Sequence, residues 1–174
     1  MSLSVPTNTS LQVRQVDLEN PGELSEALQL VNRVFDSFDA PDYSPEGIAL
    51  FHSFCSPDAL RPKLLAQEMR LWVALENEAV VGVLALRNTN HICMFFVDKA
   101  HHQQGIGRAL YQAACEHLRE QGWEFVTVFS SAYALPVYEK LGFACVAPEQ
   151  NHKGMIFTPM CAYIFWEYEK PVLK

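Results

Sequence analysis

The sequence has no hydrophobic run long enough to cross a membrane and no cluster of basic residues. Its longest apolar runs, such as AVVGVLAL, are far shorter than the roughly 20 residues of a spanning helix. The opening MSLSVPTNTS lacks the basic and then apolar segments of a secretion signal. We therefore expect no membrane partner and a cytoplasmic location. A net charge of -7 without any run of Lys and Arg also disfavours a nucleic-acid partner, because phosphate binding needs a basic face.

Paired cysteines are absent as well. The five cysteines include no CxxC pair and lie mostly inside apolar periodic segments, which indicates buried, reduced thiols. Neither HIC (91–93) nor the histidine pair at 101–102 has the ligand spacing of a zinc site. Strand alternation should also turn His91 and Cys93 to one face and Met94 to the other. We expect no metal.

The spacing of apolar residues changes along the chain between the two-residue period of strands and the roughly 3.6-residue period of helices. Prolines in SPEG and SPDA stand at first helical positions, and Asn20-Pro21 is a plausible helix start. The patterns predict helices near 22–38, 45–54, 57–66, 105–121 and 130–142, with strands at 11–16, on both sides of ENEA within 70–87, and at 91–98, 123–129, 143–147 and 155–168. The strands around ENEA and the strand at 91–98 should form an antiparallel meander. This order predicts a mixed α/β (α+β) fold, with one domain over 11–168 after a flexible N-terminus at 1–10.

The stretch AHHQQGIGRAL (100–110) joins the strand at 91–98 to the helix that follows. A strand that enters a helix through a glycine-bearing loop exposes unpaired backbone N–H groups at the positive end of the helix dipole. Gly105 and Gly107 lack the Cβ atoms that would keep a phosphate from these amides. Glycines also open many helices for packing reasons alone, so the loop by itself leaves both interpretations open.

Two other nucleotide motifs do not fit the loop. A dinucleotide fingerprint requires a small residue where Leu110 stands and an acidic residue at the end of the next strand, where TVFSS has none. The GKS or GKT of a P-loop is absent.

Two sequence motifs, in this order along the chain, resemble motifs of the GNAT superfamily of acyl-CoA-dependent N-acyltransferases. FFVDKAHHQQGIGRAL resembles its pyrophosphate loop, although His102 stands where the family carries Gln or Arg. About thirty residues on, the pattern from Ser131 to Phe143, which ends in VYEKLGF, resembles the second motif, with Ser131 in the place of Asn. The resemblance covers about residues 11–165. It implies a single twisted, mostly antiparallel sheet with splayed central strands and flanking helices, and acetyl-CoA as cosubstrate.

The resemblance also implies which residues bind acetyl-CoA. The strand ending at Val97 should hold the pantetheine arm and the thioester through the backbone of Met94–Val97, with one N–H as the oxyanion donor. The pyrophosphate should lie on the amides that follow. The implied binding residues are Phe95, Phe96, Val97, Gln103, Gln104, Gly105, Ile106, Gly107, Arg108, Ala109 and Ser131.

Acetyl transfer to an amine needs a proton donor for the leaving thiolate and a base. Tyr138 suits the donor, because a phenol with a pKa of about 10 stays protonated at neutral pH. Its alternative role is a core tyrosine. His91 stands near the place where some family members carry a glutamate base, and its alternative is a surface residue at a strand start. Asp98 is expected to cap a turn.

The acceptor should be a small-molecule or peptide amine. The proline-rich segment before residue 66 varies in the family to select substrates, so Asp39, Asp42, Tyr43 and Glu46 are expected to line the acceptor site. Two other functions stay open, an acyl-CoA-binding regulatory module that has lost catalysis and a nucleotide-binding protein. A homodimer is also left open by the resemblance.

Overall fold

The computed structural model of the protein describes residues 10–88 and 90–164. One sheet contains β1 (Gln12–Gln15), β2 (Met69–Glu76), β3 (Ala79–Arg87), β4 (His91–Val97), β5 (Phe125–Ser130), β6 (Ala144–Cys145), β7 (Gln150–His152) and β8 (Met155–Tyr163). The order is β1-β2-β3-β4-β5-β8-β6, and β7 pairs with β8 outside this path. All pairs are antiparallel except β4–β5. The predicted mostly antiparallel sheet with flanking helices is confirmed.

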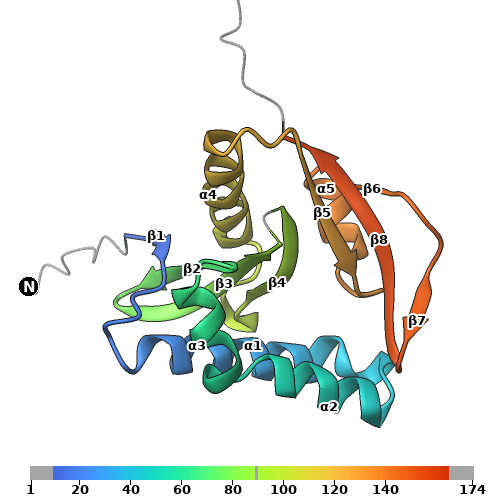
Figure 1. Cartoon of the computed structure of the whole chain (residues 1–174), viewed down its shortest axis with the longest axis horizontal. Helices are drawn as coiled ribbons and strands as arrows, with labels where there is room; N and C mark the ends of the chain where they lie inside the picture. The colour runs from blue at the N-terminus through green and yellow to red at the C-terminus, as the bar shows by residue number, and fades with distance from the viewer. Residues whose placement is uncertain (1–9, 89, 165–174) are drawn as a thin grey trace, which may run out of the picture.

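The helices cover the two faces of the sheet (Figure 1). One face carries α1 (Glu23–Phe38), α2 (Pro45–Phe54) and α3 (Pro57–Leu65), and the other carries α4 (Ile106–Glu120). Successive residues of β2 face the helices on opposite sides of the sheet, since Val73 packs toward α1–α3 and Trp72 toward α4. α5 (Leu135–Lys140) belongs to the α4 layer. None of the described helices is long and apolar enough to span a membrane.

Helix starts follow the local sequence. Ser44 and Ser56 cap α2 and α3 through their hydroxyls, which accept hydrogen bonds from the amides of Gly47 (3.2 Å) and Ala59 (3.3 Å). The expected start of α1 at Asn20-Pro21 is early, because α1 begins at Glu23. The Asn20 side chain instead accepts from Gly22 N–H (3.2 Å) in a turn before the helix.

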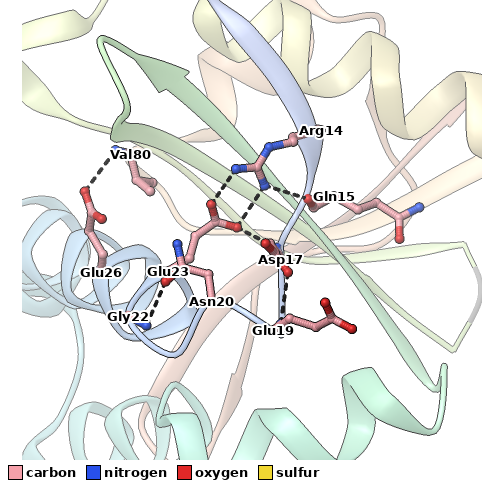
Figure 2. Close-up of polar contacts among 9 residues, drawn as sticks. All are labelled: Arg14, Gln15, Asp17, Glu19, Asn20, Gly22, Glu23, Glu26 and Val80. Carbon is pink, nitrogen blue, oxygen red and sulfur yellow. Dashed lines mark hydrogen bonds and ion pairs between the residues drawn. The ribbon is translucent and has the colours of Figure 1, made fainter.

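An ion pair ties α1 to β1, as Figure 2 shows. The Glu23 carboxylate accepts two bonds from the Arg14 guanidinium (2.6 and 2.9 Å) and a third from the Asp17 amide. The hydrogen bonds from Arg14 hold the pKa of the buried Glu23 below its usual value. One turn on, Glu26 accepts from Val80 N–H at the start of β3 (3.0 Å). These contacts fix α1 against the sheet, and α1 delivers its C-terminal end to the site described below.

The sheet opens between β4 and β5. Their parallel pairing is confined to His91 with Thr127 and Ile92 with Val128, and beyond these residues the two strands diverge (Figure 1). The predicted splay of the central strands is therefore present. Among the described residues, the edge of β4 that faces β5 has no strand partner after Ile92.

β4 also contains a bulge that strand alternation did not predict. Met94 pairs with Ala85 and Ile92 with Leu86, so Cys93 has no partner in the register of β3. As a result Cys93 and Met94 both pack toward α1–α3, whereas Phe95 packs toward α4. The expectation that Cys93 and Met94 face opposite sides is wrong, because the extra residue resets the alternation.

Most other predicted elements are confirmed. β5 begins two residues later than expected, and the strand β7 was not predicted. The predicted flexible N-terminus lies outside the described residues apart from its last residue, as do the predicted ends of the last strand and of the domain beyond 164.

Candidate active site

The loop between β4 and α4 has the backbone shape of an anion cradle. Gln103 and Gly105 both adopt positive φ angles, +61° and +81°. Gly105 is the N-cap of α4, provides no side-chain cap, and has no acidic residue in the turn that follows. The first helical bond is donated by the Ala109 amide to the Gly105 carbonyl (3.0 Å), so the amides before it have no helical acceptor. Unlike α2 and α3, α4 leaves its positive end available to a ligand.

This helix end faces a cavity of about 380 Å³. Eight predicted binding residues line it, namely Phe95, Phe96, Val97, Gln103, Gly105, Ile106, Gly107 and Arg108. Gln104 and Ala109 lie outside it, and the Gln104 side chain bonds the Ala100 carbonyl (3.4 Å). The backbone N–H donors, the two glycines and Arg108 fit a pyrophosphate, so these residues could hold the CoA portion of acetyl-CoA. We call this smaller cavity the CoA cavity.

His102 fastens this loop to β4. Its Nε2–H donates to the Val97 carbonyl at the end of the strand (2.8 Å). The side chain that departs from the family pattern therefore holds the loop in place, while the backbone faces the cavity. Asp98 caps the short turn at Lys99–His101 by accepting from the Ala100 amide (3.0 Å), as predicted, and it also bonds Arg33 (2.6 Å).

A second cavity, of about 620 Å³, lies over the opening between β4 and β5. Its walls are rich in aromatic side chains. Phe35 stacks on Phe51 with ring centroids 3.7 Å apart, and Phe129 stacks on Phe157 at 4.5 Å. Gln150–His152 of β7 form part of the cavity wall, although no residue pattern predicts a strand there. The predicted acceptor residues Asp39 and Tyr43 line this larger cavity, whereas the exposed Asp42 and Glu46 line neither cavity.

Tyr138 stands where the two cavities meet. Five residues line both cavities, namely Asp39, Phe95, Phe96, Ala134 and Tyr138. The Tyr138 ring is 5 % exposed and lies 5.9 Å from the ring of Phe95. Burial, followed by the negative charge of Asp39, raises the pKa of this phenol. Tyr138 is therefore a protonated phenol at neutral pH that faces both cavities.

His91 lies in the larger cavity at the closed end of the opening. Its Nδ1 is 2.8 Å from Thr127 Oγ1, and its ring centroid is 4.5 Å from that of Phe129. Burial, followed by the charge of Arg87, lowers the pKa of His91 to about 4. The imidazole is thus neutral at pH 7 but a weak base. Its assignment as the catalytic base stays a prediction, and the geometry gives it little support.

Ser131 occupies the turn between β5 and α5. Its hydroxyl accepts a hydrogen bond from the Ala134 amide (3.1 Å), and the same hydroxyl partly offsets the rise that burial causes in the pKa of Asp39. The side chain that replaces the family's Asn therefore stabilises the turn. Ser131 lines the larger cavity and not the CoA cavity. Its predicted contact with acetyl-CoA stays untested.

Sequence reasoning missed the aromatic pair at the mouth of the CoA cavity. The ring of Phe38, at the end of α1, stacks on Tyr133 with centroids 4.6 Å apart, and both line the smaller cavity. No local pattern could have found the pair, because the two residues are brought together only by the packing of α1 near the β5–α5 turn. Within the described residues, no group of three or more His, Cys, Asp or Glu side chains could hold a metal ion.

The opened sheet and the uncapped helix end are the arrangement that the resemblance to acyl-CoA-dependent N-acyltransferases implies. Comparison with known families agrees. Residues 39–163 of the 174 match the model of the acetyltransferase (GNAT) domain. The chain belongs to the GNAT acetyltransferase family, and membership implies the use of acetyl-CoA.

Solved structures share the fold at low sequence identity. The PaiA N-acetyltransferase of Thermoplasma acidophilum, in complex with coenzyme A, superposes with a TM-score of 0.72 at 16% identity over 88% of this chain and 99% of that one. The ribosomal-protein-S18-alanine N-acetyltransferase of Escherichia coli gives a TM-score of 0.62 at 17% identity over 92% and 98%.

A curated relative matches a shorter stretch. The glucosamine 6-phosphate N-acetyltransferase of Trypanosoma brucei brucei is 42% identical over 57 residues, which are 33% of this chain. The match spans 39% of the relative's own length. It therefore says nothing direct about the acceptor of this protein.

Proposed function

We propose that the protein is an N-acetyltransferase that transfers the acetyl group of acetyl-CoA directly to an amine. The observation that carries the proposal is the meeting of the two cavities at Tyr138. Acetyl-CoA bound along β4 and the start of α4 would place its thioester at this junction, and an amine in the larger cavity would approach from the other side. The unpaired edge of β4 supplies backbone donors for the oxyanion, and Tyr138 supplies a proton to the leaving thiolate.

Direct transfer is favoured over an acetylated cysteine. Cys93 is the cysteine that lines the larger cavity, and it is not activated. Burial raises the pKa of its thiol to about 12, and its Sγ lies 3.5 Å from the Ala85 carbonyl. Since the thiolate is the nucleophilic form, a buried thiol of this kind is a poor acetyl carrier.

The test is a thiol-release assay with acetyl-CoA against a panel of small amines, aromatic amines and peptides. The proposal expects acceptor-dependent release of CoA thiol. Tight binding of acetyl-CoA without turnover across the panel would instead support a regulatory binding module. Thermal stabilisation by ATP or NAD but not by acetyl-CoA would support a nucleotide-binding protein.

Tyr138→Phe tests the proton donor with the acceptor found in that panel. The substitution removes one hydroxyl from a buried ring, and we expect kcat to fall by about 10²-fold or more, with the Kd for acetyl-CoA unchanged. Unchanged turnover would show that another group protonates the thiolate.

Dimerisation and a cytoplasmic location stay predictions, which size-exclusion chromatography and cell fractionation would test.

A further inference from the structure

Asp39 is a buried carboxylate whose Oδ1 has no hydrogen-bond partner in the described structure. The side chain is 8 % exposed, and its Oδ1 is fully shielded from solvent. It follows the last residue of α1, where its amide bonds the Phe35 carbonyl (2.9 Å), and it lines both cavities. A buried carboxylate with one unpaired oxygen thus belongs to a residue that lines the junction where the acetyl group would be transferred.

The surroundings of Asp39 do not compensate its charge. It stands at the C-terminal end of α1, where the helix dipole disfavours an anion. The groups that act on it are the Ser131 hydroxyl and the Asp42 carboxylate, and it acts in turn on the phenols of Tyr43 and Tyr138. Burial raises the pKa of Asp39, and a smaller effect of the Ser131 hydroxyl lowers it. A carboxylate that costs stability at the junction of two cavities is typical of a functional group.

We propose, resting on the acetyltransferase function above, that Asp39 is the general base that takes the proton from the attacking amine. His91, the candidate base that the family resemblance suggested, lies at the closed end of the opening, where its Nδ1 is 2.8 Å from Thr127 Oγ1. Asp39 instead shares the junction with Tyr138, the proton donor. The two groups that exchange protons with the reactants therefore stand together.

The step balances with these two side chains. The neutral amine attacks the thioester carbonyl, a C–N bond forms, and the nitrogen becomes positively charged. The Asp39 carboxylate accepts the N–H proton, the C–S bond breaks, and the thiolate takes the hydroxyl proton of Tyr138. Transfer of the proton from the Asp39 carboxyl group to the Tyr138 phenolate restores both groups, since the carboxyl group is the stronger acid. The products are the N-acetyl amine and CoA thiol.

Asp39→Asn tests the assignment, because it keeps the shape of the side chain and removes its ability to take a proton. We expect kcat to fall by about 10²–10³-fold, while the KM for acetyl-CoA changes less than about twofold, as expected when a group acts only in the transition state. The wild-type pH profile of kcat/KM should lose activity as pH falls through the raised pKa of Asp39, and Asp39→Asn should lack this limb.

The matched control is Asp36→Asn, which makes the same change three residues earlier on an exposed part of α1 outside both cavities. It should keep wild-type turnover and the acidic limb. Wild-type kcat and an intact acidic limb in Asp39→Asn would overturn the proposal while leaving the acetyltransferase function standing. Failure of the wild-type protein to turn over any amine would instead remove the function, and the base with it.

A stability measurement separates catalysis from a structural role. Because folding raises the pKa of Asp39, its contribution to stability is present below the ordinary value of 3.8 and is lost as pH rises through the native pKa. Asp39→Asn should therefore melt at the same or a higher temperature than the wild type at pH 7, and the difference should shrink near pH 3.8. A lower melting temperature at pH 7 would show a compensated, structural carboxylate and overturn the proposal.

Discussion

Two glycines of equal backbone geometry allow the phosphate-binding role of the α4 loop to be separated from its effect on stability. Gly105 and Gly122 stand at opposite ends of α4, and both have φ near +81°. A Cβ added at either position would meet no atom within 4 Å. Gly105 lines the CoA cavity, whereas Gly122 lies about 25 Å away along the helix and lines neither cavity.

Alanine at either position must adopt the left-handed conformation, which costs about 1 kcal/mol. For a chain of this size, 1 kcal/mol corresponds to a fall of about 2–4 °C in Tm. Gly105→Ala and Gly122→Ala should therefore lose similar stability. Only Gly105→Ala places a methyl group beside the amides that would bind the pyrophosphate. Loss of one charge-assisted hydrogen bond, about 1.5–3 kcal/mol, weakens acetyl-CoA binding by roughly 10- to 150-fold.

The assay is isothermal titration calorimetry with acetyl-CoA on both variants, after thermal unfolding has shown comparable losses of stability. The expected result is a raised Kd for Gly105→Ala and a wild-type Kd for Gly122→Ala. A wild-type Kd in both variants would refute the placement of the pyrophosphate at this helix end. A Kd raised equally in both would attribute the effect to the general stability of α4.

Two further predictions concern contacts that hold the walls of the site. Glu23→Gln should lower the free energy of unfolding by about 1–2 kcal/mol at pH 7, because it removes the charge that pairs with Arg14; the loss is no larger because Arg14 is partly exposed to solvent. Urea unfolding should show this loss above pH 4.5, and the loss should disappear as pH falls through the lowered pKa of Glu23. A loss that does not depend on pH would contradict the prediction. Gly154→Ala should cost about 2–3 kcal/mol, since its φ is +83° and the added Cβ would stand 1.6 Å from Ser44 Oγ, which caps α2. An unchanged Tm would show that the β7–β8 turn does not press against Ser44.

Elements that depend on neighbouring residues could be predicted from the sequence. The Ser-Pro pairs define the starts of α2 and α3, and a change of period at Gly105 defines the start of α4. The bulge at Cys93 could not be found in this way, because the sequence of β4 alone does not show how many residues of β3 stand opposite it. β7 was missed for another reason. Its three residues are all exposed and form a strand only through their register with β8.

The same division holds within the site. The loop that would bind the pyrophosphate is local, and its residues were predicted from the strand, the glycines and the helix that follow one another in the chain. The pairing of Asp39 with Tyr138 is not local. Asp39 follows α1 and Tyr138 lies in α5, so their shared junction depends on the packing of two layers of the sheet. Spacing along the sequence carries no record of that distance.

The opening between β4 and β5 explains why the acidic and the basic group are found together. A continuous sheet would pair the edge of β4 with β5 and leave no room for a thioester. The separation after Ile92 exposes the β4 backbone, and α1 and the β5–α5 turn must then close the space on either side. The end of α1 brings a carboxyl group and α5, which follows the turn, brings a phenol, and burial raises the pKa of both. A phenol that holds its proton and a carboxylate that binds one more readily are the two properties that acetyl transfer requires. Because one desolvated junction produces both, substitutions that admit water there should move the two pKa values together toward their ordinary values.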